Sequence, residues 1–284
     1  MSDAFADLVL SDYVERYRGG ETPNPCGRCN RLLRFGRALE YARQNGFDAV
    51  ATGHHVRLFA EDGSFGLLCG ADPAKDQSYF LYGLGQRELG RLLFPVGDRT
   101  KAEVFDIARS HRLTCAELPE SQDLCFALAG DTSFLFDDAD FTVGPILDVA
   151  GREIGRHDGL PNYTVGQRRG LRITSDRPLY VVKIDPQRNA VIVGEEATLL
   201  REELTAFDVN YLSGLPPEDR MNVDAKIRYR SPAASARLQA PTPERFGLSF
   251  REPQRAVAPG QIAAIYDGDR LLGGGTIARS GPLT

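Results

Sequence analysis

A Cys-x-x-Cys motif, Cys26-Gly27-Arg28-Cys29, is the feature of the sequence with the clearest chemical potential. Thiols in the first turn of a helix lie near the positive end of its dipole, which lowers their pKa and favours the thiolate. Arg28 and Arg31 add positive charge nearby. The preceding Thr22-Pro23-Asn24-Pro25 is stiff, because two prolines fix φ and restrict their neighbours. The motif therefore predicts reactive thiols on a rigid approach.

Three further cysteines leave several chemistries open. Cys125 follows a polar run, Ser121-Gln122-Asp123, that predicts a mobile loop. Cys69 and Cys115 stand among apolar residues, so we expect them to be buried and inert. A structural zinc site would need Cys115 and Cys125 as its further ligands, although they form no second Cys-x-x-Cys motif. A thioredoxin-like redox pair fits poorly, because no aromatic strand precedes the motif.

The bulk composition indicates a water-soluble protein of ordinary character. The chain has 284 residues, of which 42% are hydrophobic and 26% charged, enough for two or three domains. No apolar run is long enough for a transmembrane helix, and the first residues lack the basic region of a signal peptide. Five cysteines, an odd number, favour a reducing compartment. We expect a cytoplasmic protein without a membrane partner.

The net charge of −5 excludes a global field that would attract nucleic acid, so RNA binding would depend on local basic patches. Taken singly, each such patch is better explained as a solvated charged face, and three patches beside cysteine chemistry keep RNA binding open. The patches are Arg28, Arg31, Arg34 and Arg37 at every third position, Gln167-Arg168-Arg169, and Lys226-Ile227-Arg228-Tyr229-Arg230.

The elements that would position the motif alternate between helix and strand up to about Gly130. Asn30 is a candidate cap for a helix that ends at Gly46, and Phe47 to Thr52 is typical of a buried strand that ends at Gly53-His54-His55. Thr100 with Glu103 indicates a capping box. This succession predicts an α/β domain, in which ligands bind at the carboxyl ends of strands, where His54 falls.

From about Asp131 onward the pattern becomes β-rich. Asp185 to Asn189 joins two strand-like runs as a hairpin, and Asp267-Gly268 joins Ile262–Tyr266 to a second apolar run. The Ala- and Pro-rich run from Ala233 to Pro243 predicts a loop or an edge. Short strands with turn signals indicate a small barrel. We predict domains at 1–130, 131–205 and 206–284.

Taken in order, the motifs resemble those of the tRNA-specific 2-thiouridylase family, the tRNA uridine 2-sulfurtransferases. They are Thr22-Pro23-Asn24-Pro25-Cys26-Gly27-Arg28-Cys29-Asn30, Ala51-Thr52-Gly53-His54-His55, Lys75-Asp76-Gln77-Ser78-Tyr79-Phe80-Leu81, Leu93-Phe94-Pro95-Val96-Gly97, Cys125-Phe126, Tyr163-Thr164-Val165-Gly166-Gln167-Arg168-Arg169-Gly170-Leu171, Lys226-Ile227-Arg228-Tyr229-Arg230, Ala258-Pro259-Gly260-Gln261 and Leu272-Gly273-Gly274-Gly275. The resemblance implies an α/β domain with a truncated, adenine-nucleotide-hydrolase-like parallel sheet, a small β-rich central domain that binds tRNA, and a C-terminal β-barrel.

The resemblance also implies a reaction, the ATP-dependent 2-thiolation of the wobble uridine of tRNA. ATP, bound with Mg²⁺, adenylates the uridine C2 oxygen, and a cysteine persulfide then delivers sulfur. By position, Cys125 matches the persulfide carrier and Cys29 the second catalytic cysteine, which implies nucleophilic thiolate chemistry and a disulfide bond. A cysteine desulfurase or a sulfur-relay protein is the implied sulfur donor.

The remaining site residues follow from the same resemblance. Gly53 matches a backbone contact to ATP. The tRNA contacts are Asn24, Pro25 and Cys26 against the target base, with His54, Lys75, Asp76, Gln77, Arg228, Tyr229 and Gln261 elsewhere. Cys26, Cys29 and Cys125 could alternatively hold a [4Fe-4S] cluster with one open iron, as some sulfur-transfer relatives are thought to do.

One departure from the family pattern matters. The family begins with a strand that runs into Ser-Gly-Gly-x-Asp-Ser, the PP-loop whose backbone amides grip the ATP phosphates, and this sequence contains no such loop. We expect the printed start to be internal to a longer protein. The alternatives are a separate N-terminal ATP-binding chain that completes the sheet, or a tRNA-binding or sulfur-relay protein without ATP activation.

Overall fold

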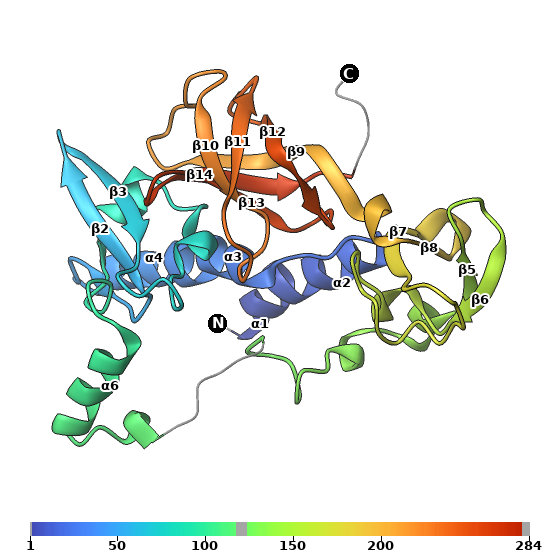
Figure 1. The fold of residues 1–284 in the computed structure, drawn as a ribbon. Helices are drawn as coiled ribbons and strands as arrows, with labels where there is room; N and C mark the ends of the chain where they lie inside the picture. The colour runs from blue at the N-terminus through green and yellow to red at the C-terminus, as the bar shows by residue number, and fades with distance from the viewer. Residues whose placement is uncertain (1, 118–123, 280–284) are drawn as a thin grey trace.

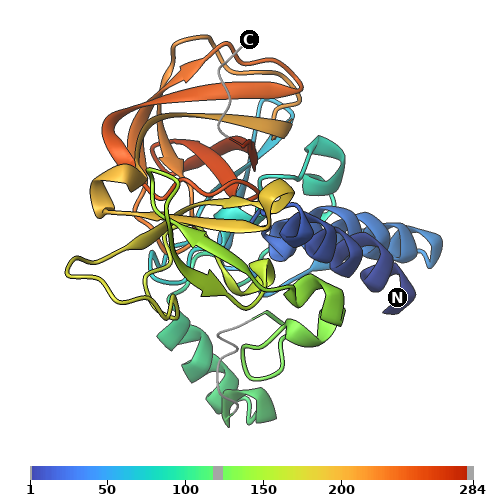
Figure 2. The same cartoon turned by 90° about the vertical axis from the view of Figure 1, so that its right-hand side faces the viewer.

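The computed structural model of the chain describes residues 2–117 and 124–279. Two helices of the N-terminal part run beneath a β-barrel, and a small sheet lies at one end of them (Figures 1 and 2). The predicted fold class is confirmed, because a parallel strand pair, a mixed sheet and a closed antiparallel barrel follow one another along the chain. The predicted loop at 121–123 lies outside the described residues. No helix in the described ranges is long and apolar enough to cross a membrane.

The first two helices each contain a π-helical segment. The helix that covers 2–18 consists of α1 (Ser2–Phe5), η1 (Ala6–Leu10, π) and α2 (Ser11–Arg18). The helix that covers 25–44 consists of α3 (Pro25–Cys29), η2 (Asn30–Arg37, π) and α4 (Ala38–Gln44).

The predicted cap at Asn30 is wrong. Helix α3 already begins at Pro25, and the Asn24 side chain accepts a hydrogen bond from the Gly27 amide at 3.1 Å. Asn24 thus caps the helix, with proline at the first position, where a missing N–H costs nothing. The predicted end is confirmed, since Gly46 follows the last turn with φ +78°.

The parallel sheet is short. Strand β1 (Val50–Ala51) pairs with β4 (Leu92–Leu93), so the predicted buried strand from Phe47 to Thr52 is reduced to two residues. Phe47 is 61% exposed and Leu93 is 52% exposed. The other elements of this part are the hairpin of β2 (Val56–Glu61) and β3 (Ser64–Cys69), η3 (Ser78–Leu81, 3-10), α5 (Gln86–Leu89), α6 (Lys101–Ser110) and η4 (Thr114–Glu117, 3-10). The capping box at the start of α6, between Thr100 and Glu103, is confirmed.

The central part forms a four-stranded mixed sheet in the order β6-β5-β8-β7. The predicted hairpin is confirmed, because β7 and β8 pair antiparallel around Asp185–Asn189. The bounds are β5 (Gly144–Leu147), β6 (Glu153–His157), β7 (Tyr180–Asp185) and β8 (Ala190–Gly194), with the 3-10 turns η5 (Ser133–Leu135), η6 (Asp138–Phe141), η7 (Leu160–Asn162), η8 (Pro186–Arg188) and η9 (Glu196–Leu199).

The C-terminal barrel closes through the order β13-β10-β11-β12-β9-β14, with β14 paired back to β13. Its strands are β9 (Leu200–Tyr211), β10 (Asn222–Lys226), β11 (Ala234–Gln239), β12 (Arg245–Arg255), β13 (Ile262–Asp267) and β14 (Arg270–Ile277). The predicted loop or edge from Ala233 to Pro243 is wrong, because β11 lies between β10 and β12 and buries Ala236 and Leu238. The boundary predicted at 205/206 falls inside β9.

The N-terminal part and the barrel share one hydrophobic core. Phe35, Tyr79 and Tyr82 of the N-terminal part pack in one cluster with Ile262 and Tyr266 of the barrel. Strand β3 also pairs with β14 through Leu67 and Leu271. The barrel therefore supports the N-terminal helices directly, which fixes the segment around the Cys-x-x-Cys motif against it.

Candidate active site

The approach to the cysteine motif is held by the barrel. The Thr22 amide donates to the Pro259 carbonyl at 2.8 Å, and Gln261 Nε2 donates to the Thr22 carbonyl at 3.0 Å. Gly27 lies so close to β13 that an added Cβ would stand 2.6 Å from Ile262 Cδ1. The motif from Ala258 to Gln261 thus meets the cysteine motif in space, although more than two hundred residues separate them in sequence.

Both thiols of the motif are half-buried, and the predicted lowering of their pKa is wrong. Burial, together with the neighbouring thiolate charges of Cys125 and Cys29, raises the pKa of Cys26 to about 11. Burial also raises the pKa of Cys29, against the opposing effect of Arg34. Desolvation disfavours the charged thiolate more strongly than the nearby positive charge favours it.

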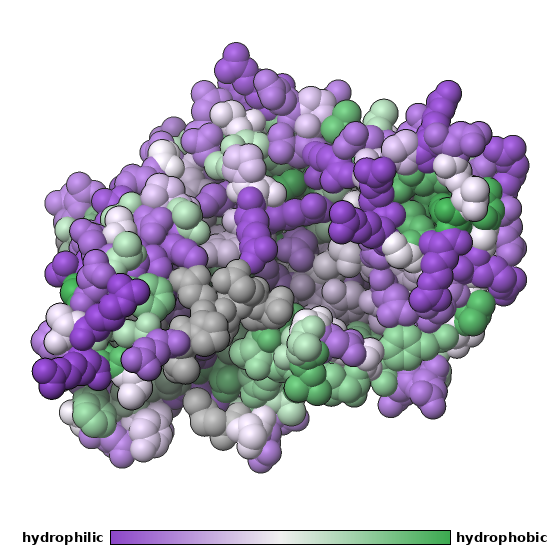
Figure 3. All heavy atoms as spheres, turned by 60° about the horizontal axis from the view of Figure 1, so that its bottom comes forward, coloured by the Kyte–Doolittle hydropathy of each residue, from purple (hydrophilic) through white to green (hydrophobic). Residues whose placement is uncertain are grey.

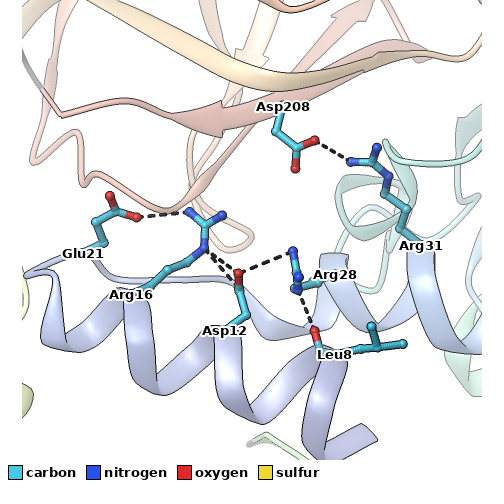
Figure 4. Close-up of polar contacts among 7 residues, drawn as sticks. All are labelled: Leu8, Asp12, Arg16, Glu21, Arg28, Arg31 and Asp208. Atoms are coloured by element: carbon cyan, nitrogen blue, oxygen red, sulfur yellow. Dashed lines mark hydrogen bonds and ion pairs between the residues drawn. The ribbon is translucent and has the colours of Figure 1, made fainter. Parts of the chain in front are cut away.

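Two arginines that were expected to act on the thiols bind other groups of the chain (Figure 4). Arg28 Nε donates to the Leu8 carbonyl at 2.6 Å, and Arg28 Nη1 lies 3.4 Å from Asp12 Oδ1. Arg31 pairs with Asp208 of β9 at 3.0 Å. Two of the four arginines of the predicted basic patch over 28–37 are therefore paired with carboxylates of the same chain.

Arg34 is the guanidinium that acts on the thiols. Its charge lowers the pKa of Cys29 and of Cys26, and it also lowers the pKa of His54. Cys29 and Arg34 are five residues apart on either side of the start of the π-helical segment, where residues i and i+5 share a face. A spacing rule for α-helices misses this pair, and only recognition of the π turn would have singled it out.

Cys125 belongs to the same neighbourhood. Its thiol is exposed, and its charge acts on both Cys26 and Cys29. The neighbouring ring of Phe126 packs on Tyr13, with ring centroids 5.4 Å apart. The structure thus brings together the three cysteines that the sequence singled out. All five cysteines are free thiols, so the disulfide bond stays a prediction.

The other two cysteines differ from one another. Cys69 is half-buried beside the shared core, with Sγ 3.7 Å from Ser78 Oγ. Cys115 is exposed, next to Leu113, which is 51% exposed, so its predicted burial is wrong. Within the described residues no group of three or more His, Cys, Asp or Glu side chains is arranged to hold a metal ion, which gives the iron–sulfur and zinc alternatives no support.

The Gly53-His54 corner lies at the carboxyl end of β1. His54 is 7% exposed, its Nδ1 is 2.6 Å from Thr52 Oγ1, and its ring packs between Phe35 and Phe94. Burial lowers the pKa of His54 to about 4, with Arg34 as the second cause, so the ring is neutral at pH 7. Gly53 faces open space, because an added Cβ would meet no atom within 4 Å. An open backbone position at a strand end fits the predicted contact to ATP.

In the Lys75-Asp76-Gln77 segment, the side chains of Asp76 and Gln77 make hydrogen bonds within the fold. Asp76 is 4% exposed and accepts hydrogen bonds from the amides of Gly70 and Ser78, while Lys226 Nζ lies 3.2 Å from its carboxylate. Gln77 exchanges two 3.0 Å hydrogen bonds with the backbone of His55. Contacts of these side chains with tRNA stay predictions.

The barrel residues that were predicted to contact tRNA also make internal contacts. Arg228 Nη2 donates to the carbonyls of Ala256 at 2.5 Å and Val165 at 3.3 Å, and burial lowers its pKa. Tyr229 lies against Phe80, with ring centroids 4.5 Å apart. Exposed basic side chains in these segments are Arg230, which follows Tyr229, and Arg168 and Arg169, which lie in the loop before β7.

The comparisons with known proteins agree with this layout. Residues 1–129 match the tRNA methyl transferase HUP domain, residues 132–195 the tRNA methyl transferase PRC-barrel domain, and residues 201–277 the aminomethyltransferase β-barrel domain. The order of these domains defines the class of protein, in which an α/β HUP domain is followed along the chain by two β domains. The tRNA-specific 2-thiouridylase MnmA of Roseiflexus castenholzii is 46% identical over 97% of this chain and 79% of its own length. The same protein of Chloroflexus aggregans is 46% identical over 97% of this chain and 78% of its own length. The chain belongs to the tRNA-specific 2-thiouridylase family.

Proposed function

We propose that the protein catalyses 2-thiolation of the wobble uridine of tRNA in the cytoplasm, with Cys125 and Cys29 as its catalytic residues. The observation that carries the proposal is the meeting of Cys26, Cys29 and Cys125 beside Arg34, next to the Gly53-His54 corner. Thiols that share the neighbour Arg34 with His54, at the carboxyl end of β1, fit the transfer of sulfur to a bound ligand.

The division of roles follows the family resemblance, and the exposure of the thiols supports it. Cys125 is exposed, so a cysteine desulfurase or a sulfur-relay protein can reach it and leave an outer sulfur as a persulfide. Cys29 is half-buried, and Arg34 partly offsets the rise in its pKa that burial causes. Cys26 follows Asn24 and Pro25 against the target base and stays protonated at pH 7, because its pKa is about 11.

ATP, bound with Mg²⁺ and with the backbone of Gly53 as one contact, would adenylate the uridine C2 oxygen with release of pyrophosphate, which makes AMP the leaving group. The outer sulfur of Cys125 forms the new bond to C2 as AMP departs. The Cys29 thiolate then attacks the Cys125 sulfur, which releases the thiolated base and leaves a Cys29–Cys125 disulfide. A thiol reductant then reduces the Cys29–Cys125 disulfide to two thiols and is itself oxidised to a disulfide.

The test measures 2-thiouridine in tRNA by nucleoside mass spectrometry, after incubation with ATP, Mg²⁺ and a persulfide donor. We expect Cys29→Ser and Cys125→Ser each to abolish thiolation while tRNA affinity stays unchanged. Cys115→Ser, which removes an exposed thiol outside the cluster, is the matched control. Thiolation by either catalytic variant would overturn the assignment.

A second candidate is a tRNA-binding or sulfur-relay protein without ATP activation. The observation that favours it is the exposed thiol of Cys125, which a sulfur donor can load without any nucleotide, and we assign no residue to the ATP phosphates. Persulfide loading of Cys125 and tRNA binding without AMP release would select this candidate. AMP release that depends on tRNA would exclude it.

We also propose that a further polypeptide segment, which carries the phosphate loop, covers the β1–β4 edge. This segment belongs either to this chain or to a separate one. Apolar side chains that reach solvent there support this, since Phe47 is 61% and Leu93 is 52% exposed. Exposed apolar side chains also gather on the face shown in Figure 3. Leu93→Lys is expected to lower ATP-dependent activity and to leave tRNA affinity intact. Unchanged activity would contradict this proposal.

A further inference from the structure

The helix over residues 2–18 touches the two cysteine segments at separate points. Arg28, which stands between Cys26 and Cys29, donates to the Leu8 carbonyl at 2.6 Å and pairs with Asp12 at 3.4 Å (Figure 4). Asp12 is held in turn by Arg16 at 3.0 Å, and Arg16 also pairs with Glu21. The Cys-x-x-Cys turn is therefore tied to this helix through a partly buried network.

The segment that carries Cys125 is tied to the same helix by aromatic packing. The Phe126 ring lies 5.9 Å from the Phe5 ring and 5.4 Å from the Tyr13 ring, edge to face in the second case. Tyr13 is 4% exposed, and its hydroxyl lies 3.1 Å from Thr132 Oγ1. Further along, Arg18 pairs with Asp140 at 2.7 Å.

These two attachments matter because the backbone around Cys125 has little regular structure of its own. The described residues from Leu124 to Thr132 form turns and one isolated bridge, between Leu128 and Asp131. Such a segment keeps a thiol in place only through its side-chain anchors. Two reacting groups held at a fixed separation react with a much higher effective concentration than free groups do.

We propose that Arg28 and Phe126 are positioning residues, which hold Cys29 and Cys125 at reacting distance by anchoring both cysteine segments on the helix 2–18. The contacts that give them this role are made with the helix. The inference rests on the proposed function, because it assigns a purpose to the closeness of these two thiols.

The test uses a disulfide equilibrium that needs no tRNA. In a protein with Cys26→Ser, Cys69→Ser and Cys115→Ser, one glutathione disulfide oxidises Cys29 and Cys125. One thiolate attacks it and releases a first glutathione, and the other thiolate then closes the protein disulfide and releases the second. The equilibrium in buffers of known glutathione ratio gives the effective concentration of the two thiols.

We expect Phe126→Ala and Arg28→Gln each to lower this effective concentration about tenfold, because each loses one anchor. Phe126→Leu, which keeps apolar bulk, is expected to recover part of it. The matched controls are Phe134→Ala, an aromatic ring of the same region that is 52% exposed, and Arg37→Gln, an exposed arginine of the same helix.

An unchanged effective concentration in a folded Phe126→Ala protein would overturn the proposal. If Phe126→Ala fails to fold, Tyr13→Phe takes its place, because it removes only the hydroxyl that meets Thr132. An unchanged effective concentration in both single variants, the folded Tyr13→Phe protein and the Arg28→Gln protein, would then overturn the proposal. Absence of tRNA thiolation would refute the proposed function alone, since the glutathione equilibrium does not depend on it.

Discussion

Gln261, in the loop before β13, donates its side-chain amide to the carbonyl oxygen of Thr22 at 3.0 Å, directly before the Pro23-Asn24-Pro25 approach to the cysteine motif. The bond is reinforced by the neighbouring Gly260, whose φ of +88° lets its backbone press against Glu21 and Thr22. An added Cβ at Gly260 would stand 2.9 Å from the Glu21 Cβ. The barrel thus supports the segment that leads to the cysteine motif, and substitutions in the barrel are expected to change the orientation of the thiols.

Gln261→Ala is expected to lower the free energy of unfolding by about 1 kcal/mol, the usual contribution of one hydrogen bond, and to lower kcat for thiolation more than it raises KM for tRNA. The reason is that the freed segment no longer presents Cys26 and Cys29 in one orientation. Gln254→Ala is the control, because the Gln254 side chain donates to the carbonyl of Glu252 in its own strand. A rise in KM alone would favour a direct contact of Gln261 with tRNA.

Arg34→Gln is expected to raise the pKa of Cys29 further, because the guanidinium is the positive charge that opposes the effect of burial. Alkylation of Cys29 by iodoacetamide, followed by mass spectrometry between pH 7 and 10, should become slower and its midpoint should move to higher pH. Arg37→Gln changes an exposed charge three residues further along the helix and should leave the profile unchanged. Equal profiles for Arg34→Gln and the unchanged protein would contradict the prediction.

Features of the fold that depend on neighbouring residues could be predicted from the sequence, and features that depend on distant pairing could not. The capping box of Thr100 and Glu103 and the hairpin over 185–189 are local, and both are confirmed. Strand β11 was mistaken for a loop because its Ala- and Pro-rich sequence lacks strand residues. It is a strand because β10 and β12 pair with it on both sides.

The same division holds for the site. The family motifs identified the cysteines that converge, but they did not predict which charged side chains act on the thiols. Arg28 and Arg31 were expected to act on the thiols, and their actual partners are Leu8 and Asp208, 20 and 177 residues away. The pKa of each thiol is set by burial, which depends on how the barrel and the first helix cover the motif.

Asp76→Ala is expected to lower the free energy of unfolding by about 3–5 kcal/mol, because it leaves Lys226 and two buried amides without their partner. Urea unfolding measures this, and the double variant with Lys226→Met should cost less than the sum of the two single variants. Asp106→Ala breaks an exposed pair with Arg109 and should cost less than about 1 kcal/mol. An Asp76→Ala protein of unchanged stability that has lost tRNA affinity would instead support a direct contact.

The buried His54 predicts a loss of stability in mild acid. Its pKa is lowered from 6.5 to about 4, so the folded state keeps the ring neutral while the unfolded chain takes up a proton as the pH falls through 6.5. The stabilisation by the neutral ring is therefore complete above pH 6.5 and is lost progressively down to pH 4, by about 3 kcal/mol at most. Urea unfolding at pH 7, 6, 5 and 4.5 should show a steeper fall for the unchanged protein than for His54→Gln. His111→Gln, at an exposed position after α6, should follow the unchanged protein. Parallel curves for His54→Gln and the unchanged protein would show that this ring does not titrate between the folded and unfolded states.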